Sequence, residues 1–156
     1  VIDEKKCIRC GKCIHSCPFG AIGSKSFIVD VINALREGKH VYAMAAPATE
    51  GQFGDDITMA SWKNAMKELG FTDFFDVGLG GDMTAAYESE EWAEAYKAGE
   101  KKVTSCCPAF VNMVRLHYPE LAECVSTTVS PMCAVSRLIK AKDPEFAKRL
   151  PKVDAI

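Results

Sequence analysis

The sequence contains no long hydrophobic run and no excess of charge of one sign. Its longest apolar stretch, VYAMAAPA at 41–48, is far shorter than the roughly 20 residues that a membrane-spanning helix needs. The formal net charge is −2, so no basic excess indicates a nucleic-acid partner. The chain opens on the charged stretch VIDEKKC instead of an apolar signal segment. We therefore expect a protein without a membrane span, in a cytoplasmic setting.

Cysteine is the residue type that the chain has in excess, with 8 among 156 residues. The cysteines are clustered and not spread like a disulfide framework. In a chain without an export signal, clustered cysteines bind metal more often than they pair with each other. Four of them crowd the N-terminus, namely Cys7, Cys10, Cys13 and Cys17.

These four cysteines follow the spacing C-x2-C-x2-C-x3-C-P within residues 7–18. This is the bacterial ferredoxin run for a [4Fe–4S] cluster. Gly11 lets the loop close around a cluster and Pro18 directs the chain away from it. The alternative is a zinc knuckle, which prefers C-x2-C pairs set further apart. We expect residues 1–26 to be a ferredoxin-like iron–sulfur segment.

The fourth cysteine of such a run ligates the other cluster in two-cluster ferredoxins. Either the segment holds a single cluster through all four cysteines, or a second repeat precedes Val1. We expect the second arrangement, because no initiator methionine stands before Val1.

After residue 26 the sequence alternates between helical and strand-like stretches. Helices are predicted at 28–38, 56–70, 83–98, 108–118 and 131–141, and strands at 40–47, 73–78, 101–105 and 152–156. Such alternation predicts an α/β fold, a parallel sheet flanked by helices. We assign residues 27–156 to this second domain. Ligands bind beyond the carboxyl ends of parallel strands, which points to the loops at 46–54, 78–82 and 105–108.

Cys106 and Cys107 lie at one of these strand ends, directly before a predicted helix. Pro108 suits the first helical position, and a helix N-terminus favours the thiolate form of a nearby cysteine. The alternative is that both are small, buried apolar residues.

The stretch TSCCPAF at 104–110 resembles the first signature of the [FeFe]-hydrogenase catalytic domain, in the PAF variant of its smaller branches. The resemblance extends over most of the chain. APATEGQFG at 46–54 is similar to the family's first active-site loop, and GLGGDMTAAYESEEW at 78–92 to the segment leading into its acidic helix. Residues 117–140 are similar to the linker and the helix that follow.

The resemblance implies a role for each matching position. Cys107 would ligate the [4Fe–4S] part of the H-cluster, and Cys106 would pass protons beside the di-iron part. Ala46 and Pro47 would place backbone against the diatomic iron ligands.

The family's proton path to the surface would include Glu88, Glu91 and Ser126. Glu88 and Glu91 are three residues apart, so they share a helix face. The stretch ESEEWAEAY is acidic throughout, and a solvated helix face is an equally good interpretation of it.

Some positions depart from the family's pattern. Ala48 and Met132 stand where a hydroxyl side chain and a glutamine are common, which favours tuned activity or sensing. We interpret Cys124 and Cys133 as structural and His117 as a helix-end residue.

The family's second and third signatures, which supply the other H-cluster thiolates, are expected beyond Ile156. The chain is thus interpreted as a portion of an [FeFe]-hydrogenase, inactive alone, that interconverts H2 with protons and electrons. Its expected partners are the remaining C-terminal half of the catalytic domain and a ferredoxin or similar electron carrier. The alternatives are a non-catalytic relative that senses H2 or assembles iron–sulfur clusters, or a simple ferredoxin-like electron carrier.

Overall fold

The computed structural model describes residues 2–143. The chain divides into two compact units, one formed by Val1–Phe27 with Ala85–Ser130 and the other by Ile28–Thr84 with Pro131–Ile156. Each unit is described by itself. The strand predicted at 152–156 lies outside the described residues.

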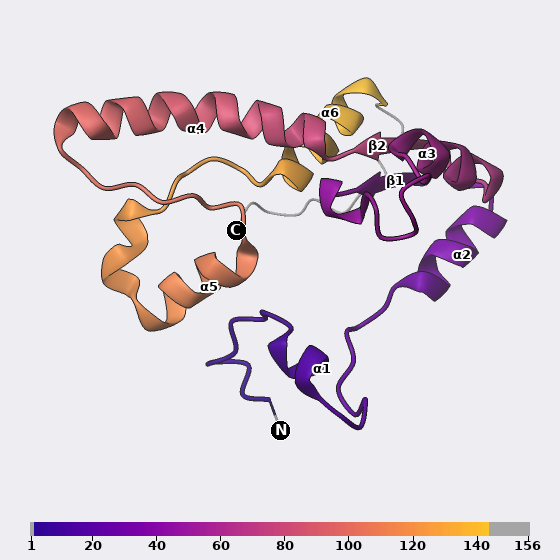
Figure 1. Ribbon diagram of the computed structural model, residues 1–156, viewed down its shortest axis with the longest axis horizontal. Coiled ribbons are helices and arrows are strands. Elements are labelled where there is room, and N and C mark those ends of the chain that lie inside the picture. Colours follow the sequence, from indigo (N-terminus) through magenta and orange to yellow (C-terminus); the bar gives the residue numbers. More distant parts are fainter. Residues whose placement is uncertain (1, 144–156) are drawn as a thin grey trace. The chain divides into compact units, whose positions relative to one another are not determined.

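A parallel pair of strands forms the sheet of the second unit (Figure 1). Strand β1 (Tyr42–Ala45) pairs with β2 (Asp73–Asp76), with Tyr42 opposite Asp73 and Ala45 opposite Asp76. The connection between them contains helix α3 (Met59–Glu68), which packs on β2. The prediction of a parallel sheet flanked by helices is confirmed.

Helices α2 (Ile28–Arg36) and α3 lie within the stretches 28–38 and 56–70 that were predicted to be helical, and each is shorter than predicted by a few residues. Gly38 adopts a φ of 66°, and the amide of Lys39 donates to Ala34 O at 3.0 Å, so a glycine closes α2. The Thr58 hydroxyl caps α3 by accepting from the amide of Ser61.

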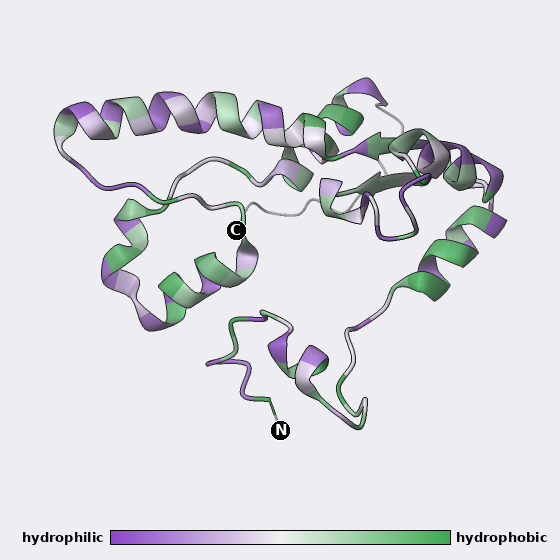
Figure 2. Ribbon diagram, viewed as in Figure 1, coloured by the Kyte–Doolittle hydropathy of each residue, from purple (hydrophilic) through white to green (hydrophobic). Residues whose placement is uncertain are grey.

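The apolar faces of the same two helices border a shared groove of about 510 Å³. Hydrophobic residues are prominent along α2 (Figure 2). The apolar residues that line the groove are Ile28, Val31, Ile32, Leu35, Met66, Leu69 and Phe71.

Helix α4 (Gly78–Ala98) begins earlier than predicted. The expectation that GLGGD at 78–82 forms an irregular ligand loop is wrong, because these residues are the first helical turns. The Asp76 carboxylate accepts from the amide of Gly78 at 2.8 Å, which satisfies one of the free amides at the helix start. An acidic side chain there also complements the helix dipole.

Gly80 lets α4 approach helix α6 (Pro131–Lys142) closely. A Cβ at Gly80 would lie 2.1 Å from the carbonyl oxygen of Pro131 and 2.7 Å from Cγ2 of Val135. Val135 is fully buried, and Ala134 and Ile139 of the same helix are buried too. Gly80 is therefore required for the close packing of α4 against α6.

At the other end of α6, Asp143 fixes the helix to the start of β1. Its carboxylate accepts from the Tyr42 hydroxyl at 2.6 Å and contacts Nδ1 of His40 at 3.3 Å. The hydrogen bond to this carboxylate raises the pKa of Tyr42.

The first unit contains α1 (Lys12–Ser16), the greater part of α4, α5 (Pro108–His117) and a 3-10 helix, η2 (Pro119–Cys124). Within residues 2–143, the predicted strand 101–105 is reduced to one parallel bridge between Val103 and Val125. The amide of Val103 donates to Cys124 O, and that of Ser126 to Val103 O, both at 2.8 Å. KKVTS has a single apolar residue, which is too few for a strand buried on both faces.

None of the helices in residues 2–143 is both long and apolar enough to cross a membrane.

We predict that Gly80→Ala lowers the free energy of unfolding by about 1–3 kcal/mol, the usual cost of overpacking. The new methyl group would meet a backbone carbonyl, which cannot rotate away as a side chain can. Urea unfolding followed by circular dichroism measures the change.

Gly81→Ala is the matched control, because a Cβ at Gly81 meets nothing within 4 Å. This variant should gain up to about 1 kcal/mol from helix propensity. Equal stability of the two variants would contradict a packing role for Gly80.

Candidate functional site

The two adjacent cysteines lie at the start of α5, as predicted. Cys107 is the residue that precedes the helix and Pro108 is its first residue. The carbonyl of Cys107 accepts from the amide of Val111 at 3.1 Å, and both thiols are exposed. Ser105 fixes the approach to the pair by donating its hydroxyl to Thr128 O at 2.7 Å. The pair is thus held by the backbone while both sulfur atoms stay accessible.

Thr104 connects this pair to helix α4. Its hydroxyl donates to the Glu88 carboxylate, at 3.1 Å from Oε1, and accepts from the amide of Cys106 at 3.4 Å. The Glu88 carboxylate and the backbone amide of Cys106 are therefore connected through a threonine that the sequence analysis did not single out. In the sequence, the position of Thr104 two residues before Cys106 could have pointed to it.

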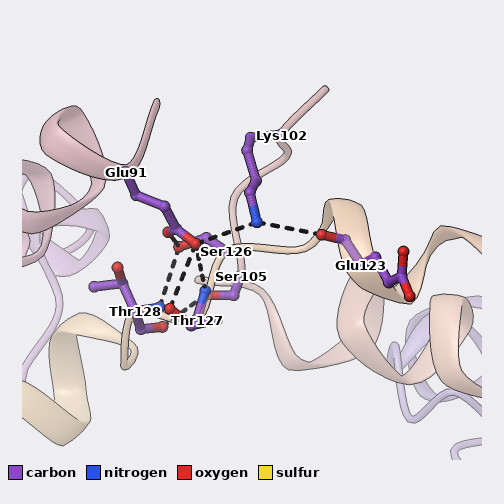
Figure 3. Close-up of polar contacts among 7 residues, drawn as sticks. All are labelled: Glu91, Lys102, Ser105, Glu123, Ser126, Thr127 and Thr128. Carbon is purple, nitrogen blue, oxygen red and sulfur yellow. Dashed lines mark hydrogen bonds and ion pairs between the residues drawn. The ribbon is translucent and has the colours of Figure 1, made fainter. Parts of the chain in front are cut away.

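Glu91 and Ser126, the other two predicted relay residues, contact each other directly (Figure 3). The Ser126 hydroxyl donates to Oε2 of Glu91 at 2.6 Å, and the Ser126 residue is 5% exposed. Thr127 donates its amide to Oε1 of the same carboxylate at 3.2 Å and its hydroxyl at 3.4 Å. Glu91 thus joins α4 to residues 126–127.

Lys102 completes the surroundings of Glu91. Its Nζ lies 3.4 Å from Oε1 of Glu91 and donates to Glu123 O at 3.2 Å. The pKa of Glu91 is lowered, chiefly by the Ser126 hydrogen bond and further by Thr127 and Lys102, which outweigh its partial burial. Sequence reasoning did not select Lys102, because nothing in KKVTS distinguishes it from Lys101.

Glu88 and Glu91, the two carboxylates predicted to relay protons, lie on the least exposed stripe of α4. Its members recur every three or four residues, which is the spacing of one helix face: Gly80, Thr84, Glu88, Glu91 and Ala95. Gly80, Thr84 and Ala95 are buried, and Glu88 and Glu91 are half-buried. Glu90 and Glu94 are exposed. The acidic helix therefore has a solvated face, but Glu88 and Glu91 are not on it.

Ala46 and Pro47 belong to the second unit, at the carboxyl end of β1. Pro47–Thr49 forms a 3-10 turn, η1, in which the hydroxyl of Thr49 donates to Ala46 O at 2.8 Å. Ala46, Pro47 and Ala48 are exposed. This short loop presents small side chains that leave its backbone accessible.

The N-terminal cysteines lie in a loop with the backbone of a tight turn. Arg9 and Gly11 have φ values of 60° and 75°, and the amide of Arg9 points at Sγ of Cys7 at 3.4 Å. The backbone amides of residues 19–22, Ala21 foremost, lower the pKa of the Cys17 thiol. Four thiols within eleven residues, with amides directed at sulfur, are a donor set that fits an iron–sulfur cluster.

The side chains of this loop are not gathered around a common point. In the described part of the chain, no group of three or more His, Cys, Asp or Glu side chains is arranged to hold a metal ion.

Helix α5 also contacts the loop that carries Cys7. Nδ2 of Asn112 donates to Ile8 O at 3.4 Å, and Nε2 of His117 lies 3.1 Å from Lys6 O. His117 is the last residue of α5, as predicted, and these contacts flank Cys7 on both sides. Cys124 ends η2 and Cys133 lies on α6.

Residues 39–153 match the family of the iron only hydrogenase large subunit, C-terminal domain. The chain belongs to this hydrogenase family. Residues 1–23 match the 4Fe-4S binding domain, in agreement with the cysteine spacing.

Hydrogenases from three bacteria are similar to this chain. The periplasmic [Fe] hydrogenase large subunit of Nitratidesulfovibrio vulgaris is 32% identical, over 97% of this chain and 46% of the relative. Iron hydrogenase 1 of Clostridium pasteurianum is 33% identical over 86% of this chain and 25% of the relative. The NADP-reducing hydrogenase subunit HndD of Solidesulfovibrio fructosivorans is 31% identical over 83% of this chain and 25% of the relative.

A solved [FeFe]-hydrogenase structure, from work on oxygen damage to the 2Fe subcluster of its H cluster, shares the fold. It superposes with a TM-score of 0.68 and 25% identity, over 82% of this chain and 37% of the other. This hydrogenase chain thus corresponds to between a quarter and just under half of the length of these relatives.

We predict that Glu91→Gln destabilises the protein at pH 7 by about 1–2 kcal/mol, because Lys102 loses its charged partner. The pKa of Glu91 is lowered in the folded protein. Its contribution to the free energy of unfolding is therefore present above the pKa of an unfolded glutamate, about 4.3, and is lost as the pH falls below that value. The difference in the free energy of unfolding between variant and wild type should therefore be constant from pH 7 to about pH 5 and clearly smaller at about pH 3, measured by urea unfolding.

Glu90→Gln, an exposed carboxylate of the same helix, is the control and should have little effect at either pH. If the Glu91→Gln difference were the same at both pH values, the carboxylate would not be stabilised by its neighbours.

Proposed function

We propose that this chain is a portion of an enzyme that interconverts H2 with two protons and two electrons. The observation that carries the proposal is the pair of carboxylate contacts in the first unit. Glu88 is connected through the Thr104 hydroxyl to the backbone amide of Cys106, and Glu91, one turn further along α4, is hydrogen-bonded to Ser126. Family membership and the 4Fe-4S binding match support it.

The cofactors proposed for this chain are [4Fe–4S] clusters, one ligated by Cys7, Cys10 and Cys13 and another by Cys17, and the H-cluster at Cys107. The exposed thiol of Cys107 at the start of α5 suits an iron ligand. The loop at Ala46 and Pro47 would offer backbone to the diatomic ligands. When bound, the H-cluster would supply the centre at which H2 is cleaved and the path by which two electrons leave.

The residues of the chain would move the proton. The Cys106 sulfur would pass on the proton that heterolytic cleavage of H2 releases, and the Glu88 carboxylate, oriented by the Thr104 hydroxyl, would accept it next. The Ser126 hydroxyl and the Glu91 carboxylate then carry it toward solvent. In H2 production the same groups pass a proton inward. Each group returns to its starting protonation state after a proton enters and leaves.

The proposed partners are the remaining part of the catalytic domain and an electron carrier of the ferredoxin type. The N-terminal iron–sulfur segment would exchange electrons with that carrier. Clustered cysteines that bind an iron–sulfur cluster suit a reducing compartment, so we expect a cytoplasmic setting, although one of the relatives is named periplasmic.

Anaerobic reconstitution with iron and sulfide should give a chain that contains a [4Fe–4S] cluster, detected by iron and sulfide analysis and by EPR after reduction. Cys13→Ser should lose most of this signal because one of the thiolates is removed. Cys133→Ser, outside the motif on α6, is the matched control. A chain that takes up no cluster under these conditions would overturn the iron–sulfur assignment.

Replacing Cys106 tests the catalytic assignment in the enzyme assembled with a complete catalytic domain. We expect Cys106→Ala to lower H2 turnover about 10²- to 10⁴-fold, the usual contribution of a general acid–base group. The iron content should not change, because Cys107 is the ligand. Cys133→Ala is the control. Turnover near the wild-type rate in Cys106→Ala would show that the proton leaves by another group.

A further inference from the structure

Lys102 is the positive charge in the network around Glu91. The Lys102 side chain is 16% exposed and the Glu91 side chain 20% exposed, so both charges are largely removed from water. Burying a lysine is costly unless an anion and further hydrogen-bond acceptors surround it. Glu91 supplies the anion and the carbonyl of Glu123 supplies a second acceptor (Figure 3).

The hydrogen bonds of Glu91 do not by themselves require a lysine. The Ser126 hydroxyl and the amide and hydroxyl of Thr127 already donate to the carboxylate. Lys102 adds a full positive charge on the Oε1 side, away from the bond between Oε2 and Ser126. It therefore affects which protonation state Glu91 adopts and which oxygen faces Ser126.

The surroundings of Glu91 would otherwise be negative. A groove of about 280 Å³ is lined by Glu91, Lys102, Glu94, Glu100 and two alanines. Like charges near a carboxylate favour its protonated form. Lys102 is the positively charged residue that lines this groove within the described residues, and its charge favours the ionised form of Glu91.

We propose that Lys102 is a positioning residue of the proton route, which stabilises the ionised form of Glu91 and keeps its Oε2 directed at Ser126. The inference rests on the proposed function, in which Glu91 exchanges a proton with Ser126. When Glu91 takes up a proton its charge pairing with Lys102 ends, while the ammonium keeps the Glu123 carbonyl as acceptor. Loss of that proton to solvent restores the pair, so Lys102 itself transfers no proton.

The test compares Lys102→Met with Lys101→Met in the chain as it stands. Both variants remove one positive charge from adjacent positions, and Lys101 is exposed. The pKa of the Glu91 carboxyl is followed by NMR on glutamate labelled with 13C at the side-chain carboxyl, with Glu91→Gln used to assign the signal. We expect the Lys102→Met variant to raise this pKa by about one, and Lys101→Met to leave it close to the wild-type value, because an exposed charge is screened.

Lys102→Arg should keep the wild-type value, since it retains the charge. If Lys102→Met proves too unstable to titrate, Lys102→Gln removes the charge while keeping a donor for Glu123 O. An equal pKa of Glu91 in the Lys101 and Lys102 variants would overturn the proposal.

A second measurement separates this proposal from the proposed function, because the carboxyl titration requires no metal. In the assembled enzyme, a protonated Glu91 cannot accept a proton from Ser126. The acidic limb of the pH profile for H2 oxidation should therefore move to higher pH in Lys102→Met, by the amount that the carboxyl pKa moves. A raised carboxyl pKa with an unmoved pH profile would overturn the role of Lys102 in the reaction and the route through Glu91.

Discussion

A carboxylate that is partly removed from water must find hydrogen-bond donors, and in the first unit this requirement holds three stretches of chain together. The Glu91 carboxylate on α4 accepts hydrogen bonds from the hydroxyl of Ser126 and the amide of Thr127, and it pairs with the ammonium of Lys102. Residue 102 leads to the cysteine pair and residue 126 follows η2. The polar contact thus organises the segments on both sides of α5, where the buried apolar residues of the unit are few, namely Ala95 and Val114.

The second unit depends on a different constraint, the close approach of two backbones. Gly80 brings the start of α4 against Pro131 at the start of α6, and a side chain there has no room. Thr84, one turn later, returns its hydroxyl to Gly80 O at 2.8 Å and is buried. The same stripe of α4 continues to Glu88 and Glu91. The same face of α4 therefore packs against α6 near its start and carries hydrogen-bonded carboxylates further along. The spacing of the residues on this face stays the same throughout.

Periodicity and local spacing predicted much of this fold. The helices at 28–38, 56–70 and 108–118 follow from apolar spacing, a closing glycine or a leading proline, all of which act within a few residues. GLGGD was misread because the need for Gly80 is created by Pro131, about fifty residues away. KKVTS was predicted to be a strand because it stands where the alternation of helices and strands calls for one. Its residues are mostly polar, however, and cannot fill a strand that is buried on both faces.

Residues of the candidate site could be predicted where they belong to a sequence motif. They could not be predicted where their role depends on a contact with a residue far away in the sequence. Cysteine spacing indicated the iron–sulfur segment, and the resemblance supplied Cys106, Glu88, Glu91 and Ser126 as expectations. Thr104 and Lys102 could not be found this way, because a threonine and a lysine are ordinary residues until a carboxylate from another element meets them. Their contribution follows from electrostatics. Donors that lower the pKa of Glu91 stabilise its ionised form, and in the proposed relay a carboxylate of lowered pKa at the outer end would release an accepted proton readily to solvent.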